Sequence, residues 1–127
     1  MASLSWSVSG RPVPQQRARF ATRTGHVYDP SSQQKQAFRK ASIEACPLPD
    51  EPLQGPLKIA IRFTYKHIKK RKRHHTSRPD VDNLVKFVLD ALQGPSGYFC
   101  DDAQITMLEA SKGYGEEPST FVHITAI

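Results

Sequence analysis

The sequence contains only two cysteines, Cys46 and Cys100, and it has no long apolar run. Two cysteines that match no metal-binding or disulfide spacing are typical of reduced thiols in a cytosolic protein. The apolar runs fall well short of the ~20 residues that span a bilayer. The first ten residues lack the basic and apolar regions of a secretory signal peptide. We therefore expect a cytoplasmic protein without a membrane segment, with residues 1–127 forming a single domain.

Acidic residues are absent from residues 66–78, which form the most basic stretch of the chain. The whole chain has 18 Lys and Arg against 12 Asp and Glu, and seven of those cations lie in this stretch. The remaining 11 cations and 12 acids nearly cancel, so the positive charge is local. Such a tract favours a polyanion partner, although a solvated loop, a membrane-surface patch or a nuclear-import signal has the same composition. Its cations are Lys66, Lys69, Lys70, Arg71, Lys72, Arg73 and Arg78.

The pattern of apolar residues predicts an α+β fold, a mixed β-sheet with two principal helices packed against it. Clean alternation over residues 57–65 indicates a buried strand. Short β-type runs on either side of Thr24-Gly25 predict a hairpin that carries Arg17 and Arg19. Ser31 and Gln34 match a capping box at the start of the first helix. Strands are expected over residues 4–10, 104–112 and 119–126, and helices over 29–45 and 81–93.

Two aspartates, Asp80 and Asp82, stand at the predicted start of the second helix. Their structural explanation is helix capping, because carboxylates satisfy the unpaired N–H groups of a first turn. Capping needs only one of them, and it does not explain why Asp82, Lys86 and Asp90 recur every four residues on one polar face. Asp90 is ~12 Å along the helix from Asp82, too far to bind the same ion.

Two adjacent acids, Asp101 and Asp102, precede the next expected strand. A metal held by Asp80 and Asp82 needs a further ligand, and residues 101–102 are the obvious source. Successive strand residues point to opposite faces, so only one of the pair would face that site. Carboxylate oxygens suit Mg²⁺ or Mn²⁺ better than zinc.

A basic tract next to a carboxylate cluster is typical of a nuclease. The cations would bind the phosphodiester backbone, and a metal held by the carboxylates can polarise a phosphate and generate hydroxide from water. Lys86, beside the cluster, could stabilise the charge that develops during cleavage. Neither feature is specific alone, and together they favour phosphodiester hydrolysis.

The segments "RPDVDNLVKFVLDALQG" and "GYFCDDAQI" resemble the RusA-type Holliday junction resolvases. That family has an Asp-x-Asp-Asn-Leu helix start, a lysine four residues on, an Asp-Ala-Leu ending and then Asp-Asp-Ala-Gln. The upstream "GRPVPQQRARF" and "HVYDP" fit as well, so the resemblance extends from about residue 10 to residue 112. It implies a RusA-like homodimer of bacteria or their phages, a Mg²⁺-dependent endodeoxyribonuclease with Mn²⁺ as a possible substitute. Such enzymes resolve four-way DNA junctions by paired symmetric nicks in recombination and repair.

The resemblance also assigns roles to individual residues. It implies that Asp80, Asp82 and Asp102 bind the metal and that Lys86 is catalytic with them. Asp90, Asp101 and Asn83 would support these residues rather than act directly. The implied partners are branched DNA and a second copy of the chain in a bacterial cytoplasm, with no membrane and no small-molecule substrate. The residues expected to bind DNA are Arg17, Arg19, Lys69, Lys70, Arg71, Lys72, Arg73 and Arg78.

Two other functions stay open from the sequence. A DNA-junction-binding module with the same fold that does not cut would have no need of the carboxylates, all of which are present. A metal-dependent enzyme acting on another phosphorylated substrate would need a nucleotide pocket, and the sequence has no glycine-rich phosphate loop. Positive charge binds any duplex, so it does not by itself indicate selectivity for junctions.

Overall fold

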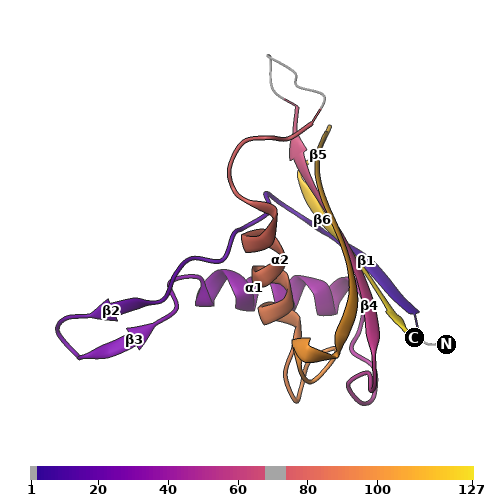
Figure 1. Ribbon diagram of the computed structural model, residues 1–127, viewed down its shortest axis with the longest axis horizontal. Coiled ribbons are helices and arrows are strands. Elements are labelled where there is room, and N and C mark those ends of the chain that lie inside the picture. Colours follow the sequence, from indigo (N-terminus) through magenta and orange to yellow (C-terminus); the bar gives the residue numbers. More distant parts are fainter. Residues whose placement is uncertain (1–2, 68–73) are drawn as a thin grey trace.

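A computed structural model describes residues 3–67 and 74–127 of the chain. It contains a four-stranded sheet in the order β1-β6-β4-β5, formed by β1 (Ser3–Ser9), β6 (Ser119–Ala126), β4 (Leu57–Lys66) and β5 (Ile105–Gly115). β4 and β5 are parallel, whereas β6 is antiparallel to both β1 and β4. Both principal helices, α1 (Ser32–Ala45) and α2 (Val81–Leu92), lie on one side of this sheet (Figure 1). The predicted α+β fold is confirmed.

The core forms between the sheet and the helices. Alternate residues of β4 from Leu57 to Tyr65 are buried, as their alternation in the sequence predicts. On α2, the buried apolar residues are Leu84, Val85, Phe87, Val88, Ala91 and Leu92. The apolar stripe that helical spacing predicts for residues 81–93 consists of Val81, Leu84, Val85, Val88 and Leu92. It omits Phe87 and Ala91, which are buried, and it includes Val81, which is exposed. The buried surface of α2 is wider than a single stripe because the helix packs against both the sheet and α1, where Phe87 meets Phe38 edge to face.

The start of α1 differs from the sequence prediction. Ser31 precedes α1, but its side chain makes no capping hydrogen bond, so the predicted capping box is wrong. Its hydroxyl instead accepts a hydrogen bond from the backbone N–H of Gln16, which fixes the chain before the hairpin. Gly94 follows α2 with a φ of +128°, a conformation that favours glycine. Neither helix among the described residues has the length and apolar character needed to cross a bilayer.

The predicted hairpin consists of β2 (Arg19–Ala21) and β3 (His26–Tyr28), which are paired antiparallel. It extends away from the sheet and the helices (Figure 1). Phe20 and Val27 are cross-strand partners, and they are 61% and 70% exposed. The hairpin therefore presents apolar side chains to the solvent next to its arginines.

Candidate active site

The carboxylates of Asp80 and Asp82 lie at the start of α2 and are exposed. Asp80 occupies the N-cap position, and its backbone oxygen accepts a hydrogen bond from the N–H of Leu84, yet its side chain makes no capping hydrogen bond. Its nearest ionic partner among the described residues is Arg78, at a loose 3.9 Å. Capping thus does not occupy the Asp80 carboxylate, which is free to bind a ligand.

Asp101 and Asp102 precede β5 and differ in their bonding. The Asp101 side chain accepts a hydrogen bond from the N–H of Ala103 at 2.9 Å and caps the short helix η1 (Asp102–Gln104). In turn, the side-chain oxygen of Gln104 accepts a hydrogen bond from the backbone N–H of Asp101 at 3.1 Å, which completes a capping box. Asp101 therefore has a structural role, whereas the carboxylate of its neighbour Asp102 takes no part in this box.

Asp102 lies beside the C-terminal end of α2. Its backbone N–H donates a 2.8 Å hydrogen bond to the side-chain oxygen of Gln93, the C-cap of the helix. The pKa of Asp102 is raised by desolvation, then by the hydrogen bond and charge of Asp101 and the charge of Asp90. Asp90, Asp101 and Asp102 are thus neighbours at this end of the helix.

The two groups of aspartates lie at opposite ends of α2 within one chain. From the N-cap Asp80 to the C-cap Gln93 the helix rises by about 20 Å. The segment between α2 and β5 lies at the C-terminal end of α2, opposite the end at which the chain enters the helix (Figure 1). Within residues 3–67 and 74–127 no three His, Cys, Asp or Glu side chains are grouped so that they could hold one metal ion. Within one chain, therefore, Asp80 lies near Asp82 and Asp101 lies near Asp102, but the two pairs are far from each other.

Lys86 and Asn83 lie on α2 near Asp82, and both are exposed. Lys86 is one helical turn after Asp82, so the two side chains share a face. The backbone oxygen of Asn83 accepts a hydrogen bond from the N–H of Gln15 at 2.9 Å. This bond ties the segment before the hairpin to the start of α2.

Lys35 is a residue of this region that sequence reasoning missed. Its ammonium group lies 2.6 Å from the Asp29 carboxylate and 3.3 Å from that of Asp90, and its side chain is largely buried. The pKa of Asp29 is lowered, first by this hydrogen bond and then by the backbone N–H of Ser31. Lys35 thus joins the base of the hairpin to α2, and it engages the Asp90 carboxylate. Asp29 is only 6 residues from Lys35, but Asp90 is 55 residues away, so no local pattern indicates the contact between Lys35 and Asp90.

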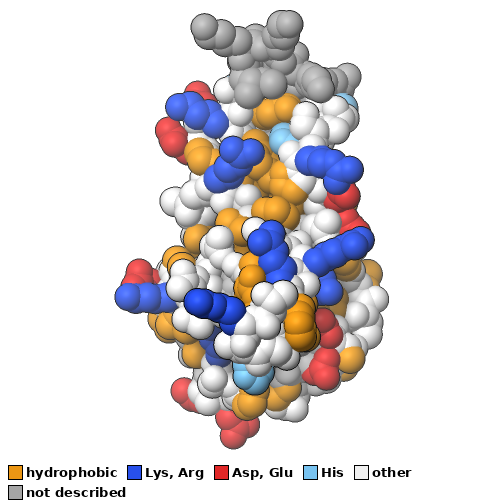
Figure 2. All heavy atoms as spheres, turned by 90° about the vertical axis from the view of Figure 1, so that its left-hand side faces the viewer, with side chains coloured by type: hydrophobic (Ala, Val, Ile, Leu, Met, Phe, Trp, Pro, Cys, Tyr) orange, Lys and Arg blue, Asp and Glu red, His pale blue; other side chains and the backbone are white. Residues whose placement is uncertain are grey.

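The residues expected to bind DNA fall into two sets. Arg17, Arg19 and Arg78 are exposed, the first two on or next to the hairpin and the third just before α2. Basic side chains occupy the middle of the face toward which the hairpin extends, and acidic side chains lie toward its margins (Figure 2). The other set, Lys69, Lys70, Arg71, Lys72 and Arg73, lies outside the described residues.

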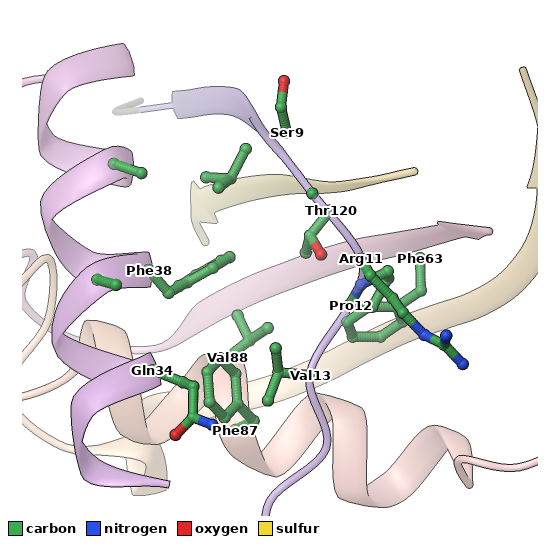
Figure 3. A pocket seen from close by; sticks show the side chains of 14 residues that line it. Ser9, Arg11, Pro12, Val13, Gln34, Phe38, Phe63, Phe87, Val88 and Thr120 are labelled. Carbon is green, nitrogen blue, oxygen red and sulfur yellow. The ribbon is translucent and has the colours of Figure 1, made fainter. Parts of the chain in front are cut away.

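A cavity of about 240 Å³ lies between α1, α2 and the segment that follows β1. Much of its wall comes from Phe38, Phe63, Phe87 and Val88, and none of the described residues that line it is acidic (Figure 3). The cavity extends the apolar core and does not provide ligands for a metal. The acidic residues of interest lie elsewhere, at the two ends of α2.

Comparison with known proteins identifies the family. The family model for endodeoxyribonuclease RusA matches residues 9–125. The chain belongs to the RusA family. It is 31% identical over 142 aligned residues to the uncharacterized protein YqaN of Bacillus subtilis (strain 168), covering 100% of this chain and 99% of that protein. It is 41% identical over 75 residues to a crossover junction endodeoxyribonuclease, rusA, of Lactococcus phage r1t, covering 57% of this chain and 56% of the phage protein.

Proposed function

We propose that this RusA-family chain is a Mg²⁺-dependent endodeoxyribonuclease that resolves four-way DNA junctions by paired symmetric nicks. The observation that carries the proposal is a pair of exposed carboxylates, Asp80 and Asp82, that the helix does not use for capping, within a chain of this family. The name of the phage relative, a crossover junction endodeoxyribonuclease, supports the substrate. The protein would act on bacterial or phage DNA in the cytoplasm, in recombination and repair.

The side chains present fit a hard divalent cation. Asp80, Asp82 and Asp102 offer only oxygen donors, the type that Mg²⁺ and Mn²⁺ prefer. When bound, the ion would polarise the scissile phosphate and offset the charge that develops on it. Lys86, exposed one turn from Asp82, would place a second positive charge beside the same phosphate.

We propose that the active site is shared between two copies of the chain. In a single chain, α2 separates Asp80 and Asp82 from Asp102 by most of its length. A second copy related by a two-fold axis would bring the Asp102 end of one α2 to the Asp80 end of the other, and it would do so twice. β5, an edge strand of the sheet that exposes Met107 and Leu108, offers a surface of the kind that subunits cover.

The dimer also suits the substrate. An open four-way junction has two-fold symmetry, and paired nicks across it are most simply made by two active sites with a matching axis. A chain of 127 residues with one Asp80–Asp82 pair supplies half of each site. The basic tract of residues 66–78 and the arginines of the hairpin would bind the backbones on either side of each site.

One assay tests the activity. The protein is incubated with a synthetic four-way junction, a matched duplex and single strands, with Mg²⁺ and with EDTA. We expect paired nicks in the junction only with Mg²⁺, and little cutting of duplex or single strands. Binding of the junction without cutting at any divalent cation would instead make the chain a junction-binding module.

A mixing experiment tests the shared site. Asp82→Asn and Asp102→Asn are each expected to be inactive, but a mixed dimer has one intact site, built from the unaltered Asp82 of one chain and the unaltered Asp102 of the other. Co-refolding the two variants should restore about a quarter of wild-type nicking, as single nicks, if random pairing forms half of the dimers as mixed ones.

The matched control is a mixture of Asp80→Asn with Asp82→Asn. Both changes damage the same half of the site, so every dimer has two defective sites and no activity should return. Sedimentation with and without junction DNA reports whether dimers form. Mixed dimers that sediment normally but do not nick in the first mixture would contradict a shared site.

A further inference from the structure

A second cavity, of about 450 Å³, lies at the end of the sheet from which the basic tract departs. Among the described residues, its lining comes from five separate segments and includes no acidic side chain. The volume lies within the range of about 300–1,000 Å³ that is usual for small-molecule sites. The residues that line it are Arg11, Tyr65, Lys66, His67, His75, Ser77, Arg78, Tyr114 and Pro118.

Aromatic rings form one wall of this cavity. Tyr65 and Tyr114 are register partners on the parallel strands β4 and β5, so their side chains lie side by side. The ring of His75 stacks on Tyr65, with 4.1 Å between centroids and 23° between planes, and it lies 5.1 Å from the ring of Tyr114. His67 lies roughly parallel to Tyr114 at 6.2 Å. The rings of His67, His75 and Tyr114 are more exposed than that of Tyr65, and they offer flat surfaces on which a planar group could stack.

Cations surround the rings. The guanidinium of Arg11 points away from Phe38 and out of the apolar cavity (Figure 3), and its Cζ lies 5.8 Å from the centroid of the Tyr65 ring. Lys66 and Arg78 line the same space. A cavity that combines fixed positive charge with stacking surfaces matches the two parts of a nucleotide, an anionic phosphate and a planar base.

The hydroxyl of Tyr65 supplies an independent observation. The side chain is 5% exposed, and its oxygen is buried without a hydrogen-bond partner among the described residues. Buried polar groups are almost always paired, so an unpaired hydroxyl in the wall of a cavity points to a ligand that would bond to it. The same burial raises the pKa of Tyr65, and the charge of Arg11 partly opposes that shift. The hydroxyl is therefore a donor at neutral pH.

The cavity is adjacent to the proposed active site. Lys112 donates hydrogen bonds to the backbone oxygens of Ser77 and Pro79, at 2.8 and 2.9 Å, which anchors the segment between the cavity and α2 to the sheet. Arg78 lines the cavity and lies 3.9 Å from Asp80. A group in the cavity would thus be held next to a phosphate at Asp80.

We infer that this cavity binds one nucleotide of the DNA strand beside the scissile phosphate, with its base turned out of the helix. Phosphate oxygens would contact Arg11, Lys66 and Arg78, and the base would stack on the rings. Turning out a base is least costly where stacking is already broken, as at the centre of a junction, so the cavity would favour branched over continuous duplex DNA. This inference rests on the proposed function, because it names part of the same substrate.

The first test does not need cleavage. The wild-type protein is titrated with a deoxynucleoside monophosphate, with the matching deoxynucleoside and with inorganic phosphate, while NMR follows the ring protons of His67 and His75. We expect the monophosphate to shift both rings and to bind at least about tenfold more tightly than either fragment. If inorganic phosphate bound as tightly as the monophosphate, the cavity would contact only the phosphate backbone of DNA and not a base. Absence of shifts with all three would overturn the inference.

Variants then locate the binding. Tyr65→Phe keeps the ring and removes the hydroxyl, and it should weaken monophosphate binding by about three- to tenfold. Arg11→Ala should weaken it by about tenfold or more. Arg62→Ala is the matched control, because Arg62 is an exposed arginine whose guanidinium lies over Phe121, outside the cavity lining. Equal affinity of Tyr65→Phe, Arg11→Ala and the wild type would overturn the inference, whereas a loss in Arg62→Ala alone would place the ligand elsewhere.

The second test uses the junction itself. Junctions with a natural or an abasic nucleotide beside the cleavage position are compared by kcat/KM. The wild type should prefer the natural base by about tenfold, and His75→Ala should lose that preference rather than slow both substrates equally. Equal slowing would show a merely structural role for His75. A wild type that binds the monophosphate but cuts no junction would refute the proposed function and leave the cavity as a nucleotide site.

Discussion

The backbone N–H of Asp102 donates its hydrogen bond to Oε1 of Gln93, while Nε2 of the same Gln93 side chain donates to Asp90 at 3.1 Å. The oxygen and the nitrogen of this one side-chain amide therefore each make a hydrogen bond, and together they hold Asp102 against the last turn of α2. Asp102 cannot move toward the start of the helix without breaking this bond. The arrangement determines which aspartates can share a metal ion within one chain, and it leads to the shared site proposed above.

The neighbours Asp101 and Asp102 are expected to differ on substitution. Asp102→Asn should abolish Mg²⁺-dependent cutting while junction binding stays intact or becomes slightly tighter, because a negative charge beside the phosphate is removed. Asp101→Asn should be milder, since asparagine caps a helix about as well as aspartate. Cleavage and binding assays on both variants measure this. Equal loss of cutting in the two variants would assign a direct role to Asp101.

Lys86 is expected to act on the rate of cutting more than on binding. Lys86→Ala should lower the single-turnover rate by about 10²–10³-fold if the ammonium group offsets charge on the phosphate during cleavage. Lys86→Arg, which keeps the charge but changes its shape, serves as the comparison. Weakened binding with a normal single-turnover rate would instead assign Lys86 to the DNA-binding surface.

The basic tract is expected to act on all DNA shapes. Neutralising Lys69, Lys70, Arg71, Lys72 and Arg73 together should weaken binding to junction, duplex and single strands alike. The dependence of log affinity on log salt should flatten by about 0.9 for each lost contact with duplex phosphate. Titrations at several salt concentrations measure the slope. An unchanged slope would show that these residues do not touch the backbone.

Asp29 is expected to stabilise the fold in a pH-dependent way. Its pKa is lowered in the folded protein, mainly by its hydrogen bond with Lys35, so the ionised form contributes stability at neutral pH. That contribution is lost as the pH falls below about 4, where the carboxyl of the unfolded chain is protonated and that of the folded chain follows. Asp29→Asn should therefore lower Tm at pH 7, and the difference from the wild type should shrink toward pH 3.

The control for this measurement is Asp50→Asn. Asp50 is exposed between α1 and β4 and takes part in no ion pair among the described residues. The Tm of the Asp50→Asn variant should therefore equal that of the wild type at every pH. A deficit in Asp29→Asn that persists unchanged at pH 3 would mean that the effect comes from packing and not from the charge.

Much of the fold follows from local patterns. The alternation over residues 57–65 and the apolar stripe from Val81 to Leu92 predicted β4 and α2, although Val81 itself is exposed, because burial of one face forces the apolar spacing of each element. The capping box at Ser31 failed because the hydroxyl found a partner outside its own helix, in Gln16. A motif of four residues cannot reveal such a competitor.

The sequence by itself predicted which residues would carry the chemistry of the candidate site. It also determined how far apart Asp82 and Asp90 lie, since the rise of a helix is the same in any fold. It did not determine the position of Asp102. That position depends on Gln93, on the parallel pairing of β5 with β4, and on Gln104, whose amide donates to the backbone oxygens of Leu53 and Gly55. These contacts join residues up to about fifty positions apart, and only the folded chain brings them together. Tertiary structure therefore decided that Asp101 and Asp102 lie at the end of α2 remote from Asp80 and Asp82.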